Sequence, residues 1–231
     1  AITIGGPITG TVQTLDINFT PGEQMDALSD VILFLPMDEN QATKYFQDQS
    51  GANNYARCGG CPTVGVQGQR SGGFQFDGGD QHLVASQGTV KLSKADFTIA
   101  AWINTTASHI GIVTKSNNNK IWEKGEKSFF LDGNGVPSFV GFGNSYIHGT
   151  TAVNDGQWHL VVVTWDYSSG TAGDGRIYVD GRDDTNTSTT NYKDQNADVN
   201  GDLLRIGKAN FGNEAPNFFK GTMDEFTVYQ R

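Results

Sequence analysis

The chain has 231 residues, a net charge of −9 and 30 glycines. This acidic balance argues against nucleic acid as a partner, because nucleic acid is bound through clustered lysine and arginine. No run approaches the roughly 20 apolar residues that a membrane-spanning helix needs, so we expect no membrane insertion. Abundant glycine, together with many Asn, Asp, Ser and Thr residues, predicts short strands joined by turns and therefore an all-β protein.

Residues 1–30 show only a weak strand pattern. Within them, Thr11–Phe19 alternates partly between apolar and polar residues, which is consistent with an added edge strand. The alternative is a linker from a preceding module. We therefore expect an N-terminal extension over residues 1–30 and one domain over residues 31–231. Because the chain begins with Ala1 rather than Met, we expect a mature protein or a module of a larger multidomain protein.

From residue 31 onward the apolar residues follow strand patterns. Val31–Pro36 is almost wholly apolar and predicts a buried strand. In Asp96–Ile103 every second residue is apolar, which predicts a strand with one buried face. Trp158–Trp165 is rich in β-branched and aromatic residues and follows a turn signal at Asn154–Gly156. The sequence therefore indicates antiparallel strands separated by glycine-containing turns.

Several of these segments resemble a known family. DGQWH at 155–159, an apolar strand and IYVDG at 177–181 resemble the laminin-G-like, concanavalin A-like jelly-roll family. Five further segments occur in the family's order: GGFQFDG, ADFTIAAWI, IVTK, LLRIG and FKGTMDEFTVYQR. The resemblance implies two antiparallel sheets packed face to face, about 10 Å apart. It leaves the function open, because one fold hosts many functions.

The resemblance also implies a structural calcium ion where the first and last strands lie side by side, under the loop Asp48–Gly51. Asp38 directly follows the first buried strand. Asp224 has the same parity as Phe226 and Val228, so we expect its carboxylate at the end of the apolar face, where it needs a partner. The alternative is that the acidic residues after the first strand merely end it and cap a loop. With backbone carbonyls completing a shell of six to eight oxygens, the expected calcium ligands are Asp38, Glu39, Asp48, Asn53 and Asp224.

The two cysteines, Cys58 and Cys61, lie in the sequence CGGCP. No further ligands are spaced for a zinc site, and the Gly-Pro setting differs from that of a redox CxxC motif. We expect a small-loop disulfide, with a pair of free thiols as the alternative. A disulfide would fit a secreted or cell-surface protein.

Aromatic residues in loops are candidates for binding a glycan, because sugar rings stack on aromatic faces while polar groups bind the hydroxyls. Trp102, Trp158 and Trp165 lie in strand patterns, so we expect them in the core. Trp122 has charged neighbours, which favours exposure. The expected ligand-binding residues are Trp122, Tyr146, His148, Tyr192 and Phe211.

Catalytic residues are not evident. Asp224 and Glu225 are adjacent, so in a regular strand they point to opposite faces and cannot form the close carboxyl pair of a retaining glycosidase. We therefore expect a non-catalytic, lectin-like carbohydrate-binding or adhesion module of an extracellular protein, stabilised by calcium. The alternatives are a polysaccharide hydrolase or lyase on the same fold, and a structural spacer or protein-binding module of a surface adhesin.

Overall fold

The computed structural model describes residues 30–85, 90, 92, 95–117, 119, 121–141, 145–167, 174–188, 202–210 and 217–230. The predicted N-terminal extension therefore lies outside the described residues, apart from Asp30. Over the described residues the chain forms two eight-stranded antiparallel sheets and one two-stranded sheet, which confirms the all-β prediction. No helix in this part of the chain is long and apolar enough to cross a membrane.

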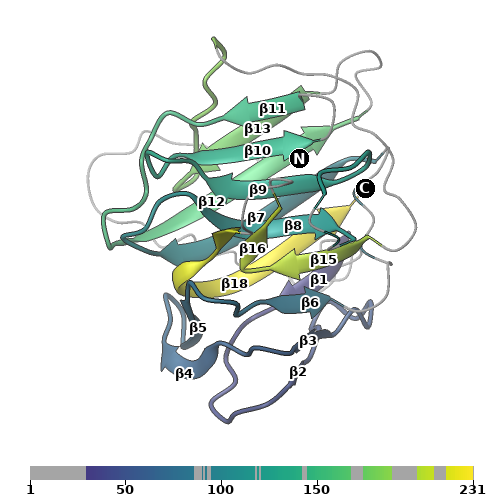
Figure 1. Cartoon of the computed structure of the whole chain (residues 1–231), viewed down its shortest axis with the longest axis vertical. Coiled ribbons are helices and arrows are strands. Elements are labelled where there is room, and N and C mark those ends of the chain that lie inside the picture. The colour runs from purple at the N-terminus through teal and green to yellow at the C-terminus, as the bar shows by residue number, and fades with distance from the viewer. Residues whose placement is uncertain are drawn as a thin grey trace, which may run out of the picture.

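The front sheet of Figure 1 runs from one edge strand, β11, to the other, β2. Its strands, in spatial order, are β11 (Ser145–His148), β10 (Pro137–Gly141), β9 (Lys127–Leu131), β8 (Ile110–Ser116), β15 (Leu203–Ile206), β6 (Leu83–Ala85), β3 (Ala56–Cys58) and β2 (Tyr45–Phe46). A two-stranded sheet of β16 (Lys208–Ala209) and β17 (Asn217–Phe218) crosses β8, where Gly111 leaves no room for a Cβ beside Ala209.

The back sheet has the last strand near its middle. Its strands, in spatial order, are β14 (Arg182–Asp183), β13 (Asp174–Val179), β12 (Trp158–Asp166), β7 (Phe97–Asn104), β18 (Lys220–Gln230), β5 (Gly72–Asp77) and β4 (Thr63–Gln67). The first strand, β1 (Val31–Leu35), also pairs with β18. The predicted neighbourhood of the first and last strands is therefore confirmed.

The core lies between the two sheets and is built by alternation along the strands. In β7 the residues Phe97, Ile99, Ala101 and Ile103 are buried, while the residues between them are half-buried on the outer face. The expectation that all three strand tryptophans belong to the core is only partly correct. Trp165 is buried, but Trp102 and Trp158 lie half-buried, because their positions in the alternation face outward.

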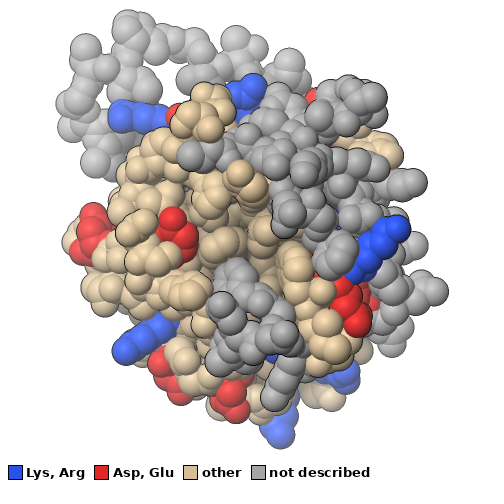
Figure 2. All heavy atoms as spheres, turned by 45° about the horizontal axis from the view of Figure 1, so that its top comes forward, with Lys and Arg blue, Asp and Glu red and all other residues tan. Residues whose placement is uncertain are grey.

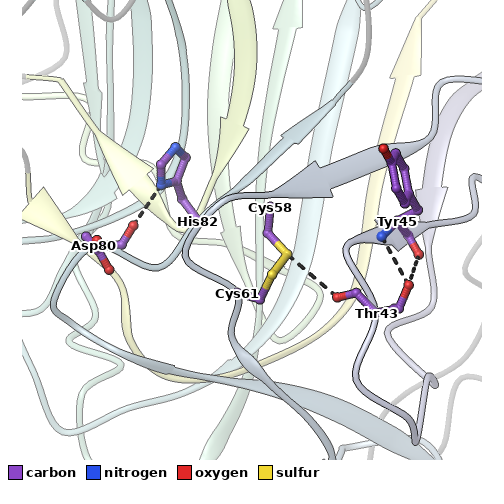
Figure 3. The surroundings of a disulfide bond; sticks show 6 residues. All are labelled: Thr43, Tyr45, Cys58, Cys61, Asp80 and His82. Carbon is purple, nitrogen blue, oxygen red and sulfur yellow. Dashed lines mark hydrogen bonds between the residues drawn. A yellow bond between two sulfur atoms is a disulfide. The ribbon is translucent and has the colours of Figure 1, made fainter.

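The disulfide between Cys58 and Cys61 is present, as predicted, with a Cα–Cα distance of 5.0 Å. It closes the turn between β3 and β4 at the edge of the front sheet (Figure 3). The sulfur of Cys58 lies 3.8 Å from the carbonyl oxygen of Thr43, which precedes β2. The disulfide fixes the turn after β3, and the N–H of Cys58 donates a hydrogen bond of 3.2 Å to the carbonyl of Lys44, which precedes β2.

His159 connects two turns of the back sheet. Its Nδ1 lies 2.8 Å from Asp180 Oδ2, and its Nε2 lies 3.2 Å from Asp155 Oδ1. Burial lowers the pKa of His159, but the hydrogen bonds and charges of Asp180 and Asp155 raise it further, so that the net shift is upward. Protonated His159 thus stabilises the folded chain.

We expect the contribution of His159 to stability to be complete below its unfolded pKa of about 6.5 and to disappear as the pH rises through the raised folded pKa. In Asp180→Asn the folded pKa of His159 should fall, because the carboxylate that raises it is gone. NMR titration of the His159 ring, with Asp183→Asn as a surface control, measures both values. An unchanged His159 pKa in Asp180→Asn would contradict this assignment.

Candidate functional site

Asp224 is completely buried although it lies on the outer face of the back sheet. Met223 pairs with Ile103 and Asp224 with Trp102, but beyond Asp224 the register shifts by a β-bulge. Within the bulge, Glu225 has a φ of 53°, in the left-handed region. The prediction that Asp224 and Phe226 lie on the same face of the strand is therefore wrong. The extra residue of the bulge places Asp224 on the outer face, while Phe226 stays on the core face.

The loop between β4 and β5 covers the Asp224 side chain. The backbone N–H of Arg70 donates a hydrogen bond of 2.8 Å to Asp224 Oδ2. A Cβ at Gly68 would lie only 2.7 Å from the same oxygen, so the close approach of this loop requires glycine. At the other end of the loop, the N–H of Gly72 donates a hydrogen bond of 2.8 Å to Asp38 Oδ1. One glycine-rich loop, residues 68–72, therefore holds both carboxylates.

These carboxyl groups carry more negative charge than their protein surroundings compensate. Asp224 Oδ1 and Glu39 Oε2 are buried and have no hydrogen-bond partner in the protein. Burial, together with the nearby Asp38 carboxylate, raises the pKa of Asp224 to about 6. Burial and the charges of Asp224 and Asp38 also raise the pKa of Glu225. A buried carboxylate oxygen without a donor is costly, so this environment suits a bound cation.

The fit to calcium depends on the number of oxygen ligands. Among the described residues, no three His, Cys, Asp or Glu side chains form a group that could hold a metal ion. Asp38 and Asp224, which the same loop holds, would therefore need further oxygens from backbone carbonyls or water to reach the six to eight of a calcium shell. We refer to Asp38 and Asp224 as the candidate metal centre; Glu39 directly follows Asp38 in the chain.

The other two predicted metal ligands have different surroundings. Asp48 is buried and accepts hydrogen bonds from the backbone N–H groups of Phe34, Ser50 and Asn54, at 2.8–2.9 Å. It thereby ties its loop to β1. Asn53 is exposed and adopts a φ of 58°. The structure therefore gives Asp48 and Asn53 roles in the loop and does not group Asp48 with two further acidic side chains.

Two of the predicted ligand-binding residues, Tyr146 and His148, lie together on the edge strand β11. Their rings approach edge to face, with centroids 5.1 Å apart. Val140 is the cross-strand neighbour of Tyr146 on the same face, and Phe130 lies one strand further in, opposite Ser138. Phe130, Val140, Tyr146 and His148 are all half-buried. We call these four residues the β11 strip.

The histidine of the β11 strip is held in one orientation. Its Nδ1 lies 3.0 Å from the hydroxyl oxygen of the buried Ser138. Burial lowers the pKa of His148, although the charge of Asp132 opposes this. The ring is therefore neutral at pH 7, and the strip presents aromatic surface with one hydroxyl and one imidazole.

Trp122 is half-buried in the loop between β8 and β9, beside the exposed Ile121. Glu126 braces this loop by accepting hydrogen bonds from the N–H groups of Asn117 and Glu123 and from the side-chain amide of Asn210. Trp122 therefore lies in the β8–β9 loop, whereas Tyr146 and His148 of the β11 strip lie on the edge strand β11. The remaining predicted ligand residues, Tyr192 and Phe211, lie outside the described residues.

Sequence reasoning missed two features of these sites. The loop 68–72 closes over the candidate metal centre, and its signal was the cluster of glycines in Gly68–Gly73. The second is a pair of exposed tyrosines, Tyr45 and Tyr55, which contact each other at the β2 edge. Their exposure follows the two-residue period of a strand: Asn54, Ala56 and Cys58 are buried, while Tyr55 and Arg57 between them are exposed.

Known proteins show the same architecture. A family model described as the concanavalin A-like lectin/glucanases superfamily matches residues 77–231, about two-thirds of the chain. A search of curated protein sequences gave no match.

Several solved structures share the fold at low sequence identity. Domain 4 of AbnA, an extracellular arabinanase from Geobacillus stearothermophilus solved in complex with arabinotriose, superimposes with a TM-score of 0.59 and 16% identity, covering 87% of this chain and 92% of that one. The binding domain of Paraclostridial Mosquitocidal Protein 1 superimposes with a TM-score of 0.58 and 17% sequence identity, covering 88% of this chain and 49% of that one. Trypanosoma rangeli sialidase, in complex with 2,3-difluorosialic acid, superimposes with a TM-score of 0.58 and 16% sequence identity, covering 87% of this chain and 31% of that one. The chain thus spans half or less of the last two.

The raised pKa of Asp224 predicts a pH effect on the metal-free protein. A carboxyl group whose folded pKa is raised stabilises the fold below its unfolded pKa and loses this contribution as the pH rises through the folded value. Between about pH 4 and pH 6, metal-free protein should therefore lose on the order of 3 kcal/mol of unfolding free energy through Asp224. Urea unfolding in chelator, at several pH values, measures this loss.

Asp224→Asn is the matched variant, because the amide oxygen can still accept the Arg70 hydrogen bond while the titrating group is removed. We expect its unfolding free energy to vary much less with pH over this interval. Parallel pH profiles for the wild type and Asp224→Asn would show that Asp224 does not titrate as described.

Proposed function

Because the chain belongs to the concanavalin A-like lectin/glucanase superfamily, we propose that it is a non-catalytic carbohydrate-binding module of an extracellular protein, stabilised by calcium. The observation that carries the proposal is the β11 strip, an aromatic surface with oriented polar groups at the edge of the front sheet. The disulfide supports an extracellular location.

The β11 strip has the chemistry that sugar binding requires. The aliphatic face of a sugar ring stacks on aromatic carbon, and its hydroxyls need donors and acceptors placed at the side. Tyr146 and Phe130 supply the aromatic carbon, while the tyrosine hydroxyl and the neutral imidazole of His148 supply hydrogen bonds. Because His148 is fixed by Ser138, little side-chain entropy is lost on binding. The complex of AbnA domain 4 with arabinotriose supports a glycan as the ligand.

The charges on one face of the domain are compatible with a neutral glycan. On the face shown in Figure 2, basic and acidic side chains are spread around the periphery, and neither sign forms a continuous patch among the coloured residues. A ligand of high charge would be expected to meet clustered charges of opposite sign.

The acidic residues are better suited to a metal than to catalysis. A glycosidase needs two carboxyl groups that reach the substrate. The Asp224 carboxyl is buried under loop 68–72, where a sugar chain cannot contact it. In our proposal Asp38, Glu39 and Asp224 hold calcium together with backbone carbonyls. The ion would neutralise the carboxylates between β1 and β18 and leave no catalytic role for them.

Glycan binding is tested by Tyr146→Ala, because removing the phenol ring removes the stacking surface. We expect at least a tenfold loss of affinity for the polysaccharide that the wild type retains, about 1.4 kcal/mol. Affinity electrophoresis in linear arabinan, xylan, mannan and β-glucan measures retention. Tyr146→Phe should keep most of the affinity. Equal retention of wild type and Tyr146→Ala would remove the β11 strip from the binding site.

Calcium is tested by thermal unfolding with calcium and with chelator. At a calcium concentration of about 100 times Kd, binding should add about 2.7 kcal/mol, or roughly 5–10 °C in Tm for a domain of this size. Asp38→Asn and Asp224→Asn should lose this increment. Asp48→Asn should lower the Tm but keep the increment, because Asp48 binds backbone N–H groups. A Tm that does not respond to chelator would contradict the calcium proposal.

A further inference from the structure

Among the residues that the structure describes, the most exposed aromatic side chains lie at the edge of the front sheet opposite β11. Tyr45 is 67% exposed and Tyr55 is 41% exposed. Their rings contact each other, with centroids 6.2 Å apart and planes inclined by 53°. Two large aromatic rings held together at the surface, rather than in the core, are candidates for an interaction site.

An exposed arginine completes this group. Arg57 on β3 is the cross-strand partner of Tyr45, so the two side chains lie on the same face of the hairpin. Tyr55 precedes Arg57 by two residues and is exposed like it, while Ala56 between them is buried. Two phenol rings and one guanidinium with five N–H donors therefore point out from one face of the β2 edge. We call Tyr45, Tyr55 and Arg57 the β2 platform.

The β2 platform is held rigid by its surroundings. The Thr43 hydroxyl donates a hydrogen bond of 3.0 Å to the carbonyl of Tyr45 and accepts one of 3.1 Å from its N–H (Figure 3). The N–H of Cys58 donates to the carbonyl of Lys44, and the disulfide fixes the end of β3. An open pocket of about 340 Å³, lined in part by Thr43 and Cys61, adjoins the hairpin. Rigid aromatic surface lowers the entropic cost of binding.

The β2 platform and the β11 strip are far apart on one sheet. A continuous row of laterally paired residues joins them, namely Tyr45, Arg57, Val84, Arg205, Thr114, Ser128, Val140 and Tyr146. Seven spacings between eight strands place the ends about 34 Å apart. The middle of this row, Arg205, Thr114 and Ser128, is buried. The two surfaces are therefore separate, and a short oligosaccharide cannot reach both.

We propose that the β2 platform is a second glycan-binding site, at which sugar rings stack on Tyr45 and Tyr55 and a hydroxyl or carboxylate group accepts hydrogen bonds from Arg57. This inference rests on the proposed carbohydrate-binding function. Each site binds a short oligosaccharide independently. A polysaccharide that reaches both is bound more tightly, because the second contact is intramolecular.

The experiment is a calorimetric titration with the trisaccharide of whichever polymer the wild type retains among linear arabinan, xylan, mannan and β-glucan. We expect two equivalents per chain for the wild type, and one each for the double variant Tyr45→Ala/Tyr55→Ala and for Tyr146→Ala. Tyr229→Ala, which removes a tyrosine that is 37% exposed on β18, is the matched control and should keep two equivalents. Tyr45→Phe/Tyr55→Phe should also keep two, because the rings remain.

The outcomes separate this inference from the proposed function. The second site would be overturned if the wild type bound one equivalent of trisaccharide and Tyr146→Ala bound none. It would also be overturned if the Tyr45→Ala/Tyr55→Ala variant still bound two equivalents. Both results would leave the β11 strip intact as a binding site. Retention of no polysaccharide would refute both. A wild-type dimer that this double variant converts to a monomer, with glycan stoichiometry unchanged, would make the β2 platform a protein interface and would also overturn the inference. Thermal unfolding of the double variant confirms that it is folded.

Discussion

The buried carboxylate of Asp224 is the constraint on which the closure of the back sheet depends. Strand β18 pairs with β7, β5 and β1, so three strands meet the strand that carries this charge. The bulge at Glu225 turns Asp224 outward, and the loop 68–72 then buries it. A charge in this position is stable only with donors or a cation around it. A Cβ at Gly68 would clash with the carbonyl oxygen of Gly72 and lie 2.7 Å from Asp224 Oδ2, so the loop that buries this carboxylate requires glycine there.

Within the described part of the chain, the front sheet is covered over the middle of its outer face but not at its two edges. Its inner face completes the core, while the middle of its outer face is covered by β16, β17 and the loop that Glu126 braces. Among the described residues, both edges of the sheet keep aromatic side chains within reach of solvent, at Tyr146 and at Tyr45. Edge strands also expose backbone N–H and C=O groups that invite pairing with other chains. The strands at both edges, β11 and β2, are short, four and two residues, which limits such pairing.

The fold was predictable because its signals are local. Alternation in Phe97–Asn104, the turn before Trp158 and the order of the family motifs each depend on a few neighbouring residues. The sites were less predictable because they depend on one extra residue and on distant contacts. Nothing in the letters around Glu225 marks a bulge, since the residue with positive φ is a glutamate rather than a glycine. This one insertion reversed the expected face of Asp224. Likewise, Tyr45 and Tyr55 meet only because β2 and β3 form a hairpin.

The pairing of β1 with β18 also decides how the domain attaches to its surroundings. Val31 lies opposite Tyr229, and the N–H of Gln230 donates a hydrogen bond of 2.8 Å to the carbonyl of Asp30. Asp30 and Gln230, at the two ends of the described domain, therefore lie next to each other. A domain with adjoining ends can be spliced into a surface turn of a host protein without stretching it. Because β1 and β18 are antiparallel, a force that pulls these two ends apart would break their hydrogen bonds one after another. The pairing of β1 with β18 would therefore separate before the rest of the sandwich.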